Sequence, residues 1–411
     1  MKTLYSIGLY IARLLIKLLA LFNPKLKLGE VGRKETFSKL KKSIRKDDRT
    51  LWFHCASLGE YEQGLPVFEK LKEQYPNHKI VLSFFSPSGY EIKKNNPLAD
   101  VVVYLPLDTS SNAKAFLDAV HPDFIIFVKY EIWPNLLNEM KLRNLRAILI
   151  SAVFRKDQSF FKWYGRFMTK ALFAFEHIFV QDAHSKELLK SLGYSATTVS
   201  GDTRFDRVSN QLEADNTVDF VEQFKNSKPL IVFGSSWPED DKLFIPFINA
   251  STSLDIKFLI APHNVKPNYT EQLKSQLNDK TVAYSQMESS DLRSAKVFIL
   301  DTIGYLSKVY SYADIAYVGG AAGDTGLHNV LEPTAFGIPV IIGTNYDKFP
   351  EARVLVQRGG IIAVSTLHEL SNTLSMLLKQ PEKAEEIGSR NTEFVKENSG
   401  AVIQILNYIR I

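Results

Sequence analysis

Residues 296–347 read KVFILDTIGYLSKVYSYADIAYVGGAAGDTGLHNVLEPTAFGIPVIIGTNYD, and this stretch is the most informative about the fold of the chain. Three uninterrupted apolar runs, VFIL, IAYVGG and PVIIG, alternate in it with polar turns and helical patterns. Such runs predict parallel strands that are buried on both faces. Ligands of parallel sheets bind beyond the carboxyl ends of the strands, where helix N-termini also attract anions. The turns at 301–305 and 319–332 therefore predict a site for a phosphorylated ligand.

The same alternation continues on both sides of this stretch. Between Thr50 and Gly201 seven apolar runs alternate with helical patterns or loops, and a second set of seven begins with PLIVFG at residue 229. The pattern predicts an α/β protein with two Rossmann-like, doubly wound domains that face an interdomain cleft. The predicted parts are a first domain over 25–205, a linker over 206–228, a second domain over 229–382, and a helical segment over 383–411 that packs back on the first domain.

Composition excludes several classes of function. The 411 residues are 45% hydrophobic and 23% charged, which is enough apolar material for two cores. The net charge of +5 is too small to indicate a nucleic-acid partner. A single cysteine, Cys55, excludes an internal disulfide and a cysteine metal cluster. The sequence contains neither GxxxxGK[ST] nor HExxH, which argues against P-loop and zinc-protease chemistry.

The amino-terminal segment 1–24 is predicted to be a membrane-anchoring helix. Residues 3–22, TLYSIGLYIARLLIKLLALF, are long enough on length alone to span a bilayer, but Arg13 and Lys17 interrupt them. Both cations share one helical face with Ser6 and Tyr10, which favours a helix lying in the membrane interface. A signal peptide fits less well, and a helix packed on the protein itself is the other alternative. From Lys2 to Arg49 there are 13 Lys and Arg against 4 Asp and Glu, which suits an anionic membrane surface.

Three charged residues of the first domain are candidates for catalysis. Glu60 follows a strand in WFHCASLGEYEQG; it either complements the helix dipole, which would tend to keep it ionised, or acts as a general base. Glu131 in FVKYEIWPN either caps the next helix or holds chemistry at a strand end. Arg204 in GDTRFDR either reaches a phosphate or carboxylate, or forms an interdomain salt bridge.

The second domain holds the candidate ligand contacts. Ser235 and Ser236 in FGSSWPEDD either contact phosphate or cap the next helix. His263 in APHN is either structural or catalytic. In LHNVLEP, backbone amides near Asn329 could hold phosphate while Glu332 accepts two hydrogen bonds from ribose hydroxyls.

These motifs together carry a family resemblance. WFHCASLGE, YEIWPN, GDTRFD, APH, LDTIGYL, ADIAYVGG and HNVLEP occur in an order and spacing that resemble the 3-deoxy-D-manno-octulosonic acid (Kdo) transferases of lipopolysaccharide assembly. The resemblance covers essentially the whole chain, including the hydrophobic amino terminus and the basic GEVGRKETF. It implies a glycosyltransferase of the GT-B fold that uses CMP-Kdo as donor and a lipid A precursor as acceptor, without a metal or another cofactor. It also implies a place at the cytoplasmic face of a bacterial inner membrane.

The resemblance assigns roles by matching position. It implies that Glu60 is the general base and that Glu131 and Arg204 stabilise the transition state. It places the CMP of the donor against Pro262, His263, Ile303, Gly304, Tyr305, Asn329, Val330, Leu331 and Glu332. Arg204 stands where many members have Lys, and Tyr305 where many have Glu. Arg33 and Lys34, in the basic segment, are candidates for binding the acceptor phosphates.

The expected reaction is a direct displacement. Glu60 takes a proton from an acceptor hydroxyl, which attacks the anomeric carbon of Kdo as CMP departs, so the configuration inverts. The first alternative is a sugar-nucleotide 2-epimerase of the same two-domain build, for which a membrane helix has no use. The others are a transferase for another nucleotide sugar, and a membrane-docked nucleotide-binding protein without catalysis.

Overall fold

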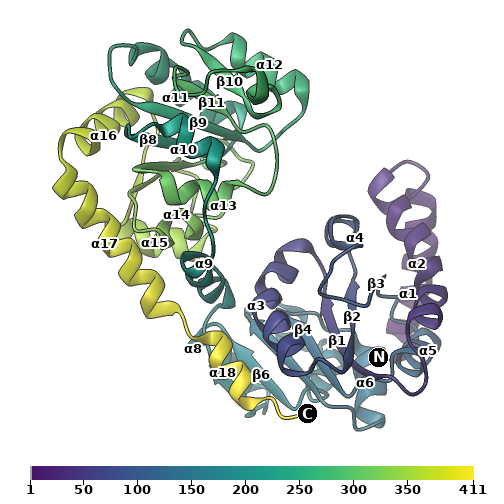
Figure 1. Cartoon of the computed structure of the whole chain (residues 1–411). Helices are drawn as coiled ribbons and strands as arrows, with labels where there is room; N and C mark the ends of the chain where they lie inside the picture. The colour runs from purple at the N-terminus through teal and green to yellow at the C-terminus, as the bar shows by residue number, and fades with distance from the viewer. Residues whose placement is uncertain (1) are drawn as a thin grey trace. The chain divides into compact units, whose positions relative to one another are not determined.

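The computed structural model describes residues 2–411, with side chains from Tyr5 onward. Met1, the first residue of the predicted anchoring segment 1–24, lies outside the described residues. The chain forms two compact units (Figure 1). The first unit runs to Arg207 and includes Ser399–Ile411, and the second unit is Val208–Asn398.

A seven-stranded parallel sheet forms the centre of the first unit, in the order β3-β2-β1-β4-β5-β6-β7. Successive side chains of β1 enter different cores: Trp52 packs on one face of the sheet, while Leu51 and Phe53 pack on the other. Both faces are thus buried, which explains the uninterrupted apolar runs. The strands are β1 (Arg49–Cys55), β2 (His78–Phe84), β3 (Val101–Tyr104), β4 (Phe124–Val128), β5 (Ala147–Ala152), β6 (His177–Val180) and β7 (Thr197–Val199).

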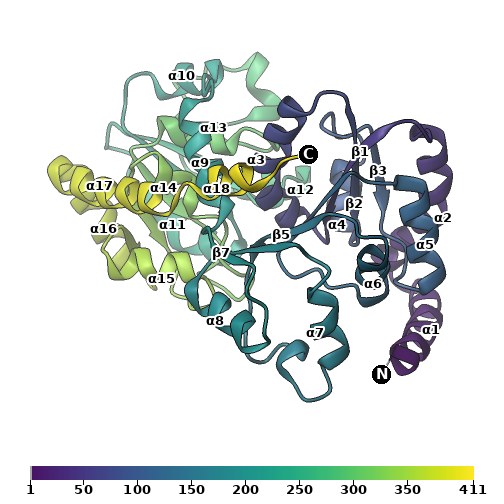
Figure 2. The same ribbon diagram turned by 90° about the horizontal axis from the view of Figure 1, so that it is seen from below.

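Helices cover both faces of this sheet. α3 and α18 supply residues to the core that contains Leu51, whereas α2, α5, α6 and α8 supply residues to the core that contains Trp52. Figure 2 shows α18 running beside α3. The helices are α1 (Lys2–Leu19), α2 (Pro24–Ser43), α3 (Leu58–Gln74), α4 (Pro87–Lys93), α5 (Ser110–Val120), α6 (Pro134–Leu142), η1 (Ser159–Phe161), α7 (Arg166–Leu172), α8 (Ala183–Ser191), α9 (Thr203–Glu213) and α18 (Ala401–Tyr408).

The second unit repeats the architecture with a parallel sheet in the order β10-β11-β9-β8-β12-β13-β14. Its strands are β8 (Leu230–Ser236), β9 (Lys257–Pro262), β10 (Thr281–Ala283), β11 (Val297–Ile299), β12 (Ile315–Val318), β13 (Val340–Ile342) and β14 (Ile361–Ala363). Its helices are α10 (Asp219–Lys225), α11 (Pro238–Ala250), α12 (Pro267–Ser275), η2 (Tyr284–Ser289), α13 (Leu306–Val309), η3 (Tyr310–Tyr312), α14 (Leu331–Ala335), α15 (Pro350–Gln357), α16 (Leu367–Lys379) and α17 (Pro381–Asn398). Two doubly wound α/β units confirm the predicted fold class.

The strand order reverses direction at one place in each sheet. β1 lies between β2 and β4, and β8 lies between β9 and β12. The connection after β1 leads to β2 on one side while that after β4 leads to β5 on the other, and the connections after β8 and β12 diverge in the same way. Ligands of doubly wound sheets bind at the carboxyl ends of strands at such a point. Most of the predicted site residues follow these strands or their neighbours.

Two predicted boundaries differ from the units of the structure. The segment 206–228, predicted as a linker, contains α10, whose Val221 and Phe224 are fully buried in the second unit's core. Of the segment 383–411, predicted to pack back on the first domain, α17 belongs to the second unit because Ile387 is buried in that unit's core. Only Ser399–Ile411 joins the first unit.

The amino-terminal helix α1 is docked on the first unit at its start. The Tyr5 hydroxyl donates to Asp108 at 2.9 Å, and the Tyr5 ring lies 5.5 Å from that of Phe167 on α7. Within residues 2–411, none of the helices combines the length and the apolar character that crossing a membrane requires.

Candidate active site

Glu60 and Glu131 meet at the carboxyl edge of the first sheet. β1 ends at Cys55 and Glu60 lies in the first turn of α3, while β4 ends at Val128, three residues before Glu131. Because β1 and β4 are paired neighbours, their carboxyl ends bring the two side chains close enough for the charge of Glu131 to act on Glu60.

The Glu60 carboxyl is buried, with 6% of the residue exposed. Burial raises its pKa to about 7, the charge of Glu131 adds to the rise, and the amide of Ala56 and the charge of Lys129 oppose it. Burial thus raises the pKa of Glu60 against the expected tendency of the helix dipole to keep this carboxyl ionised. Glu60 Oε2 accepts a hydrogen bond from the Ala56 N–H at 2.5 Å, so the same carboxyl also supports the start of α3. A carboxyl that titrates near neutral pH suits a general base.

Glu131 accepts a hydrogen bond from one ring nitrogen and does not cap a helix. Its Oε2 accepts from Trp133 Nε1 at 3.0 Å and lies 3.5 Å from His54 Nε2. The amides at the start of α6 donate to Asp108, at 2.9 Å from Asn135 and 2.8 Å from Leu136. Glu131 therefore does not cap α6, and its role in chemistry stays a prediction.

A buried chain of side chains lies behind Glu131. His54 is fully buried in β1, and its Nδ1 is 2.9 Å from Ser83 Oγ on β2. Ser83 Oγ also accepts from Trp52 Nε1 at 2.8 Å. Sequence reasoning did not select His54 or Ser83; the available signal was one polar residue in each of the apolar runs LWFHC and IVLSFF.

Arg204 is tied to the helix that carries Glu60. Its Nε donates to Asp202 Oδ2 at 2.8 Å, and Gln63 Nε2 donates to Asp202 Oδ1 at 3.2 Å. Gln63 lies three residues after Glu60 on α3, so both project from the same side of the helix. This Arg204 ion pair lies within the first unit, not between domains.

The candidate acceptor residues Arg33 and Lys34 are adjacent on α2 but differ in their surroundings. Arg33 Nη2 donates to the Phe85 carbonyl at 2.7 Å, and its guanidinium lies 4.6 Å from the centre of the Phe85 ring. Burial lowers the pKa of Arg33. Lys34 is exposed and lies 4.0 Å from Glu30. Arg33 thus fixes α2 to the loop that follows β2, at the edge where Glu60 lies, while Lys34 points to solvent.

In the second unit Glu332 contacts both Asn329, in the turn 319–332, and Ser307 of α13, the helix that follows the turn 301–305. Its Oε1 accepts from Asn329 Nδ2 at 3.1 Å and its Oε2 from Ser307 Oγ at 3.0 Å. Asn329 Oδ1 also accepts from the Leu331 N–H at 3.1 Å, so the Asn329 side chain contacts both Glu332 and the first residue of α14. Gly304, at φ 96°, shapes the first turn in a conformation that favours glycine.

The other predicted donor residues are placed around these turns. Ile303 is exposed in the first turn, and Tyr305 precedes α13 and packs against the rings of Phe220 and Tyr284. Val330 and Leu331 are buried, and the Val330 carbonyl already accepts a hydrogen bond from Thr334 Oγ1 at 2.6 Å. Pro262 ends β9.

The carboxyl end of β8 approaches the Gly-rich loop closely. Ser235 adopts φ 54°, and Ser236 is buried. A Cβ on Gly319 would lie 2.5 Å from the Ser235 carbonyl oxygen, so this approach requires glycine. The positive φ of Ser235 is unusual for a non-glycine residue, and such conformations are concentrated at functional sites.

His263 belongs to a stack of three rings that the sequence did not reveal. The centre of its ring lies 4.4 Å from that of Trp237 and 4.6 Å from that of His328, and the Trp237 and His328 ring centres are 6.4 Å apart. Trp237 Nε1 donates to His328 Nε2 at 2.9 Å. Burial lowers the pKa of both histidines, that of His328 to about 4, so both rings are neutral at pH 7. The only sequence signal for this ring cluster was that Trp237 and His328 are next to the candidate ligand contacts Ser236 and Asn329.

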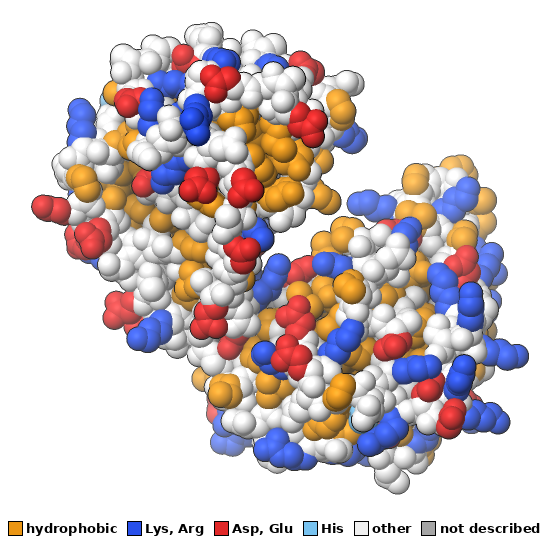
Figure 3. Space-filling view, in the orientation of Figure 1, with side chains coloured by type: hydrophobic (Ala, Val, Ile, Leu, Met, Phe, Trp, Pro, Cys, Tyr) orange, Lys and Arg blue, Asp and Glu red, His pale blue; other side chains and the backbone are white. Residues whose placement is uncertain are grey.

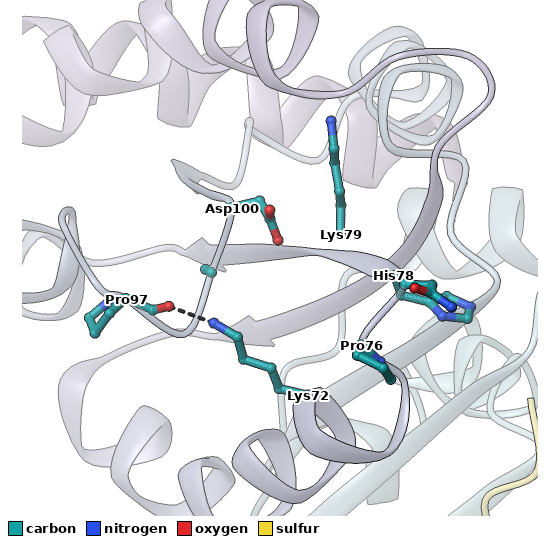
Figure 4. A pocket seen from close by; sticks show the side chains of 8 residues that line it. Lys72, Pro76, His78, Lys79, Pro97 and Asp100 are labelled. Atoms are coloured by element: carbon teal, nitrogen blue, oxygen red, sulfur yellow. Dashed lines mark hydrogen bonds between the residues drawn. The ribbon is translucent and has the colours of Figure 1, made fainter.

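A cavity of about 270 Å³ lies at the opposite edge of the first sheet (Figure 4). It is lined by residues around the end of α3 and the start of β2, including Lys72 and His78. Lys72 Nζ donates to the Pro97 carbonyl at 2.6 Å. The cavity is thus at the amino-terminal edge, away from Glu60. Across residues 2–411, we find no cluster of three or more His, Cys, Asp or Glu that could hold a metal ion.

Comparison with known proteins identifies relatives of the chain. Residues 32–207 match the sequence family described as 3-deoxy-D-manno-octulosonic-acid transferase (kdotransferase). A 3-deoxy-D-manno-octulosonic acid transferase of Haemophilus influenzae is 28% identical over 374 residues, which cover 88% of this chain and 86% of that protein.

Solved structures share the fold. A UDP-GlcNAc 2-epimerase of Neisseria meningitidis aligns with a TM-score of 0.62 at 16% identity, over 87% of this chain and 98% of that one. A glycosyltransferase of Rickettsia africae aligns with a TM-score of 0.56 at 14% identity, over 88% and 97%. At these identities the structures establish the fold alone, and it is GT-B, as predicted.

Proposed function

Because this chain belongs to the 3-deoxy-D-manno-octulosonic acid (Kdo) transferase family of glycosyltransferases, we propose that it moves Kdo from CMP-Kdo to a lipid A precursor. The observation that carries the proposal is the alignment with a named transferase over 88% of the chain, which is more than either unit alone. The paired carboxyls Glu60 and Glu131 supply the chemistry that such a transfer needs.

The proposed mechanism is a single inverting displacement. The Glu60 carboxylate takes the proton of an acceptor hydroxyl, the hydroxyl oxygen forms a bond to the anomeric carbon of Kdo, and the bond to the CMP phosphate breaks. Glu131 and Arg204 stabilise the charge that develops during this step. In this proposal a metal ion or other cofactor is not required, since backbone amides and Arg204 meet the charge of the leaving phosphate.

In the second unit, Glu332 is the proposed ribose contact. Each of its oxygens accepts one hydrogen bond, from Asn329 or from Ser307. An ionised carboxylate has about four acceptor sites, so two remain for ribose hydroxyls. The ring stack around His263 and the backbone of the Ile303–Tyr305 turn complete the proposed CMP site.

We further propose that α1 lies in the interface of the inner membrane at its cytoplasmic face. Ile7, Ile11, Leu14 and Leu18 are all more than half exposed and form one stripe at helical spacing, whereas Tyr5 faces the protein. Figure 3 shows Lys and Arg side chains gathered on the side of the first unit that carries α2. An apolar stripe beside basic residues suits an anionic lipid surface, and Lys34 is available for acceptor phosphates.

The second candidate is a sugar-nucleotide 2-epimerase, because a UDP-GlcNAc 2-epimerase has the same fold. The sequence relatives favour the transferase, since 16% identity establishes only the fold. An epimerase also has no use for the apolar stripe of α1.

The deciding experiment incubates the purified protein with CMP-Kdo and a lipid A precursor and analyses the lipid by mass spectrometry. We expect addition of Kdo by the native protein and a rate about 100-fold to 10,000-fold lower for Glu60→Gln, which cannot accept the proton. Glu73→Gln, an exposed change on the same helix, is the matched control and should keep the native rate. Epimerisation of UDP-N-acetylglucosamine without Kdo transfer would overturn the proposal, and a native rate for Glu60→Gln would remove Glu60 as the base.

A further inference from the structure

Two aromatic side chains project from the first unit in the segment 155–170, which we call the aromatic loop. Trp163 is 93% exposed and Tyr164 is 48% exposed, and their rings meet edge to face at 5.6 Å. We propose that the aromatic loop is a second membrane contact, separate from α1, that places Trp163 and Tyr164 in the interface of an anionic bilayer. The inference extends the proposed membrane location, and its test does not require transfer activity.

The loop that exposes these rings is itself well packed. The rings of Phe154, Phe160 and Phe161 contact one another at centroid distances of 5.7–6.3 Å, and Phe154 and Phe160 are buried. Thr169 Oγ1 donates to the Phe160 carbonyl at 2.8 Å. A Cβ on Gly165 would lie 1.7 Å from the Ser159 carbonyl oxygen, so glycine permits the turn that follows Tyr164. The loop is therefore held in place by its buried Phe rings while the Trp163 and Tyr164 rings stay exposed, which indicates a contact surface.

The charge of the aromatic loop complements anionic lipid. It contains Arg155, Lys156, Lys162, Arg166 and Lys170, all exposed, against one carboxylate, Asp157. Five cations and one anion leave an excess of four positive charges on 16 residues. Trp and Tyr favour the level of the lipid headgroups, where a ring is apolar on its faces and polar at one edge. Basic residues beside them add attraction to acidic headgroups.

The position of the loop agrees with that of α1. The contact between Tyr5 and Phe167 joins the start of α1 to α7, the helix that ends the loop. Figure 2 shows α7 and the start of α1 at the same margin of the first unit. The loop also follows β5, so it lies at the carboxyl edge of the sheet, where β1 and β4 lead to Glu60 and Glu131. A bilayer bound there would present a lipid acceptor to the edge that carries the proposed base.

The test is quenching of tryptophan fluorescence by brominated lipids. Vesicles of 70% phosphatidylcholine and 30% phosphatidylglycerol with brominated acyl chains are mixed with the full-length protein at low salt. The contribution of Trp163 is the difference between the native protein and Trp163→Phe, because the variant keeps Trp52, Trp133 and Trp237. We expect a quenched component that Trp163→Phe lacks, since a bilayer-inserted indole lies near the bromine atoms. Equal quenching of both proteins would overturn the proposal.

A second arm tests the charge. Lys162→Gln with Arg166→Gln should weaken binding to the same vesicles about fivefold per cation removed. The matched control, Lys114→Gln with Lys190→Gln, removes two exposed cations elsewhere on the first unit and should bind like the native protein. Equal weakening in both pairs would mean that net charge, not the loop, drives binding. Quenching of Trp163 only when lipid A precursor is present would make the loop an acceptor contact and would equally overturn the proposal.

Discussion

At the scale of single residues, the pair Glu60 and Glu131 determines how activity should respond to pH. Burial and the neighbouring carboxylate raise the pKa of Glu60 to about 7. A general base works only when deprotonated, so kcat/KM should rise with pH and level off above an apparent pKa near 7. The folded state binds the Glu60 proton more tightly than the unfolded chain, so this group stabilises the fold at low pH and the stabilisation is lost as pH rises towards 7.

Glu131→Gln tests whether the neighbouring carboxylate contributes to that pH profile. It removes the negative charge that helps to raise the pKa of Glu60 but keeps the side-chain size. The rising part of the kcat/KM profile should therefore move to lower pH. The positive charge of Lys129 acts in the opposite direction and is unchanged in the variant. A profile of Glu131→Gln that coincides with the native one would show that the two carboxyls do not interact.

The buried Ser83 hydroxyl gives a second prediction at this scale. Ser83→Ala leaves the indole N–H of Trp52 and Nδ1 of His54 without their hydrogen-bond partner inside the core. An unsatisfied buried polar group costs about 1–3 kcal/mol, so unfolding in urea should begin at a lower concentration. The exposed change Ser191→Ala is the control and should alter stability by less than about 0.5 kcal/mol. Transfer activity should also fall, because His54 then positions Glu131 less firmly.

At the scale of elements, apolar runs were sufficient to predict the strands but not all of their surroundings. IAYVGG predicted β12, because a strand buried on both faces needs apolar residues at every position. The boundary of α17 could not be predicted, because its sequence does not show which sheet its buried face will cover. The contact among the rings of Trp237, His263 and His328 could not be predicted either, because these residues come from three loops that only the folded sheet brings together.

The turns on either side of β12 yield a prediction about the donor. Glu332→Gln keeps the shape of the side chain but removes the charge that would accept ribose hydroxyls. A hydrogen bond to a charged group contributes about 1.5–3 kcal/mol, so KM for CMP-Kdo should rise about 10-fold to 100-fold while kcat changes less. The exposed change Glu382→Gln is the control in the same unit. A loss confined to kcat, with KM unchanged, would place Glu332 in the chemical step instead of in donor binding.

At the scale of the whole molecule, the first unit is completed by the last residues of the chain. Asp206 accepts hydrogen bonds from the amides of Gly400 and Ala401, at 2.9 and 3.1 Å, and so fixes the start of α18. Ile405 and Ile409 are fully buried in the core that contains Leu51. The first unit therefore cannot complete this core until Ser399–Ile411 has been synthesised, although its other residues end at Arg207.

This discontinuity predicts a selective effect of Ile405→Ala. Removing a fully buried isoleucine side chain down to Cβ costs about 2–5 kcal/mol, and here the whole cost falls on the first unit. In urea, hydrogen exchange followed by mass spectrometry should show β1 and β4 losing protection at a lower concentration, while β8 and β12 are unaffected. Ile403→Ala, whose side chain is 63% exposed on the same helix, should match the native protein. Equal destabilisation of all four strands would show that the two units unfold together, and that α18 stabilises the molecule as one cooperative body.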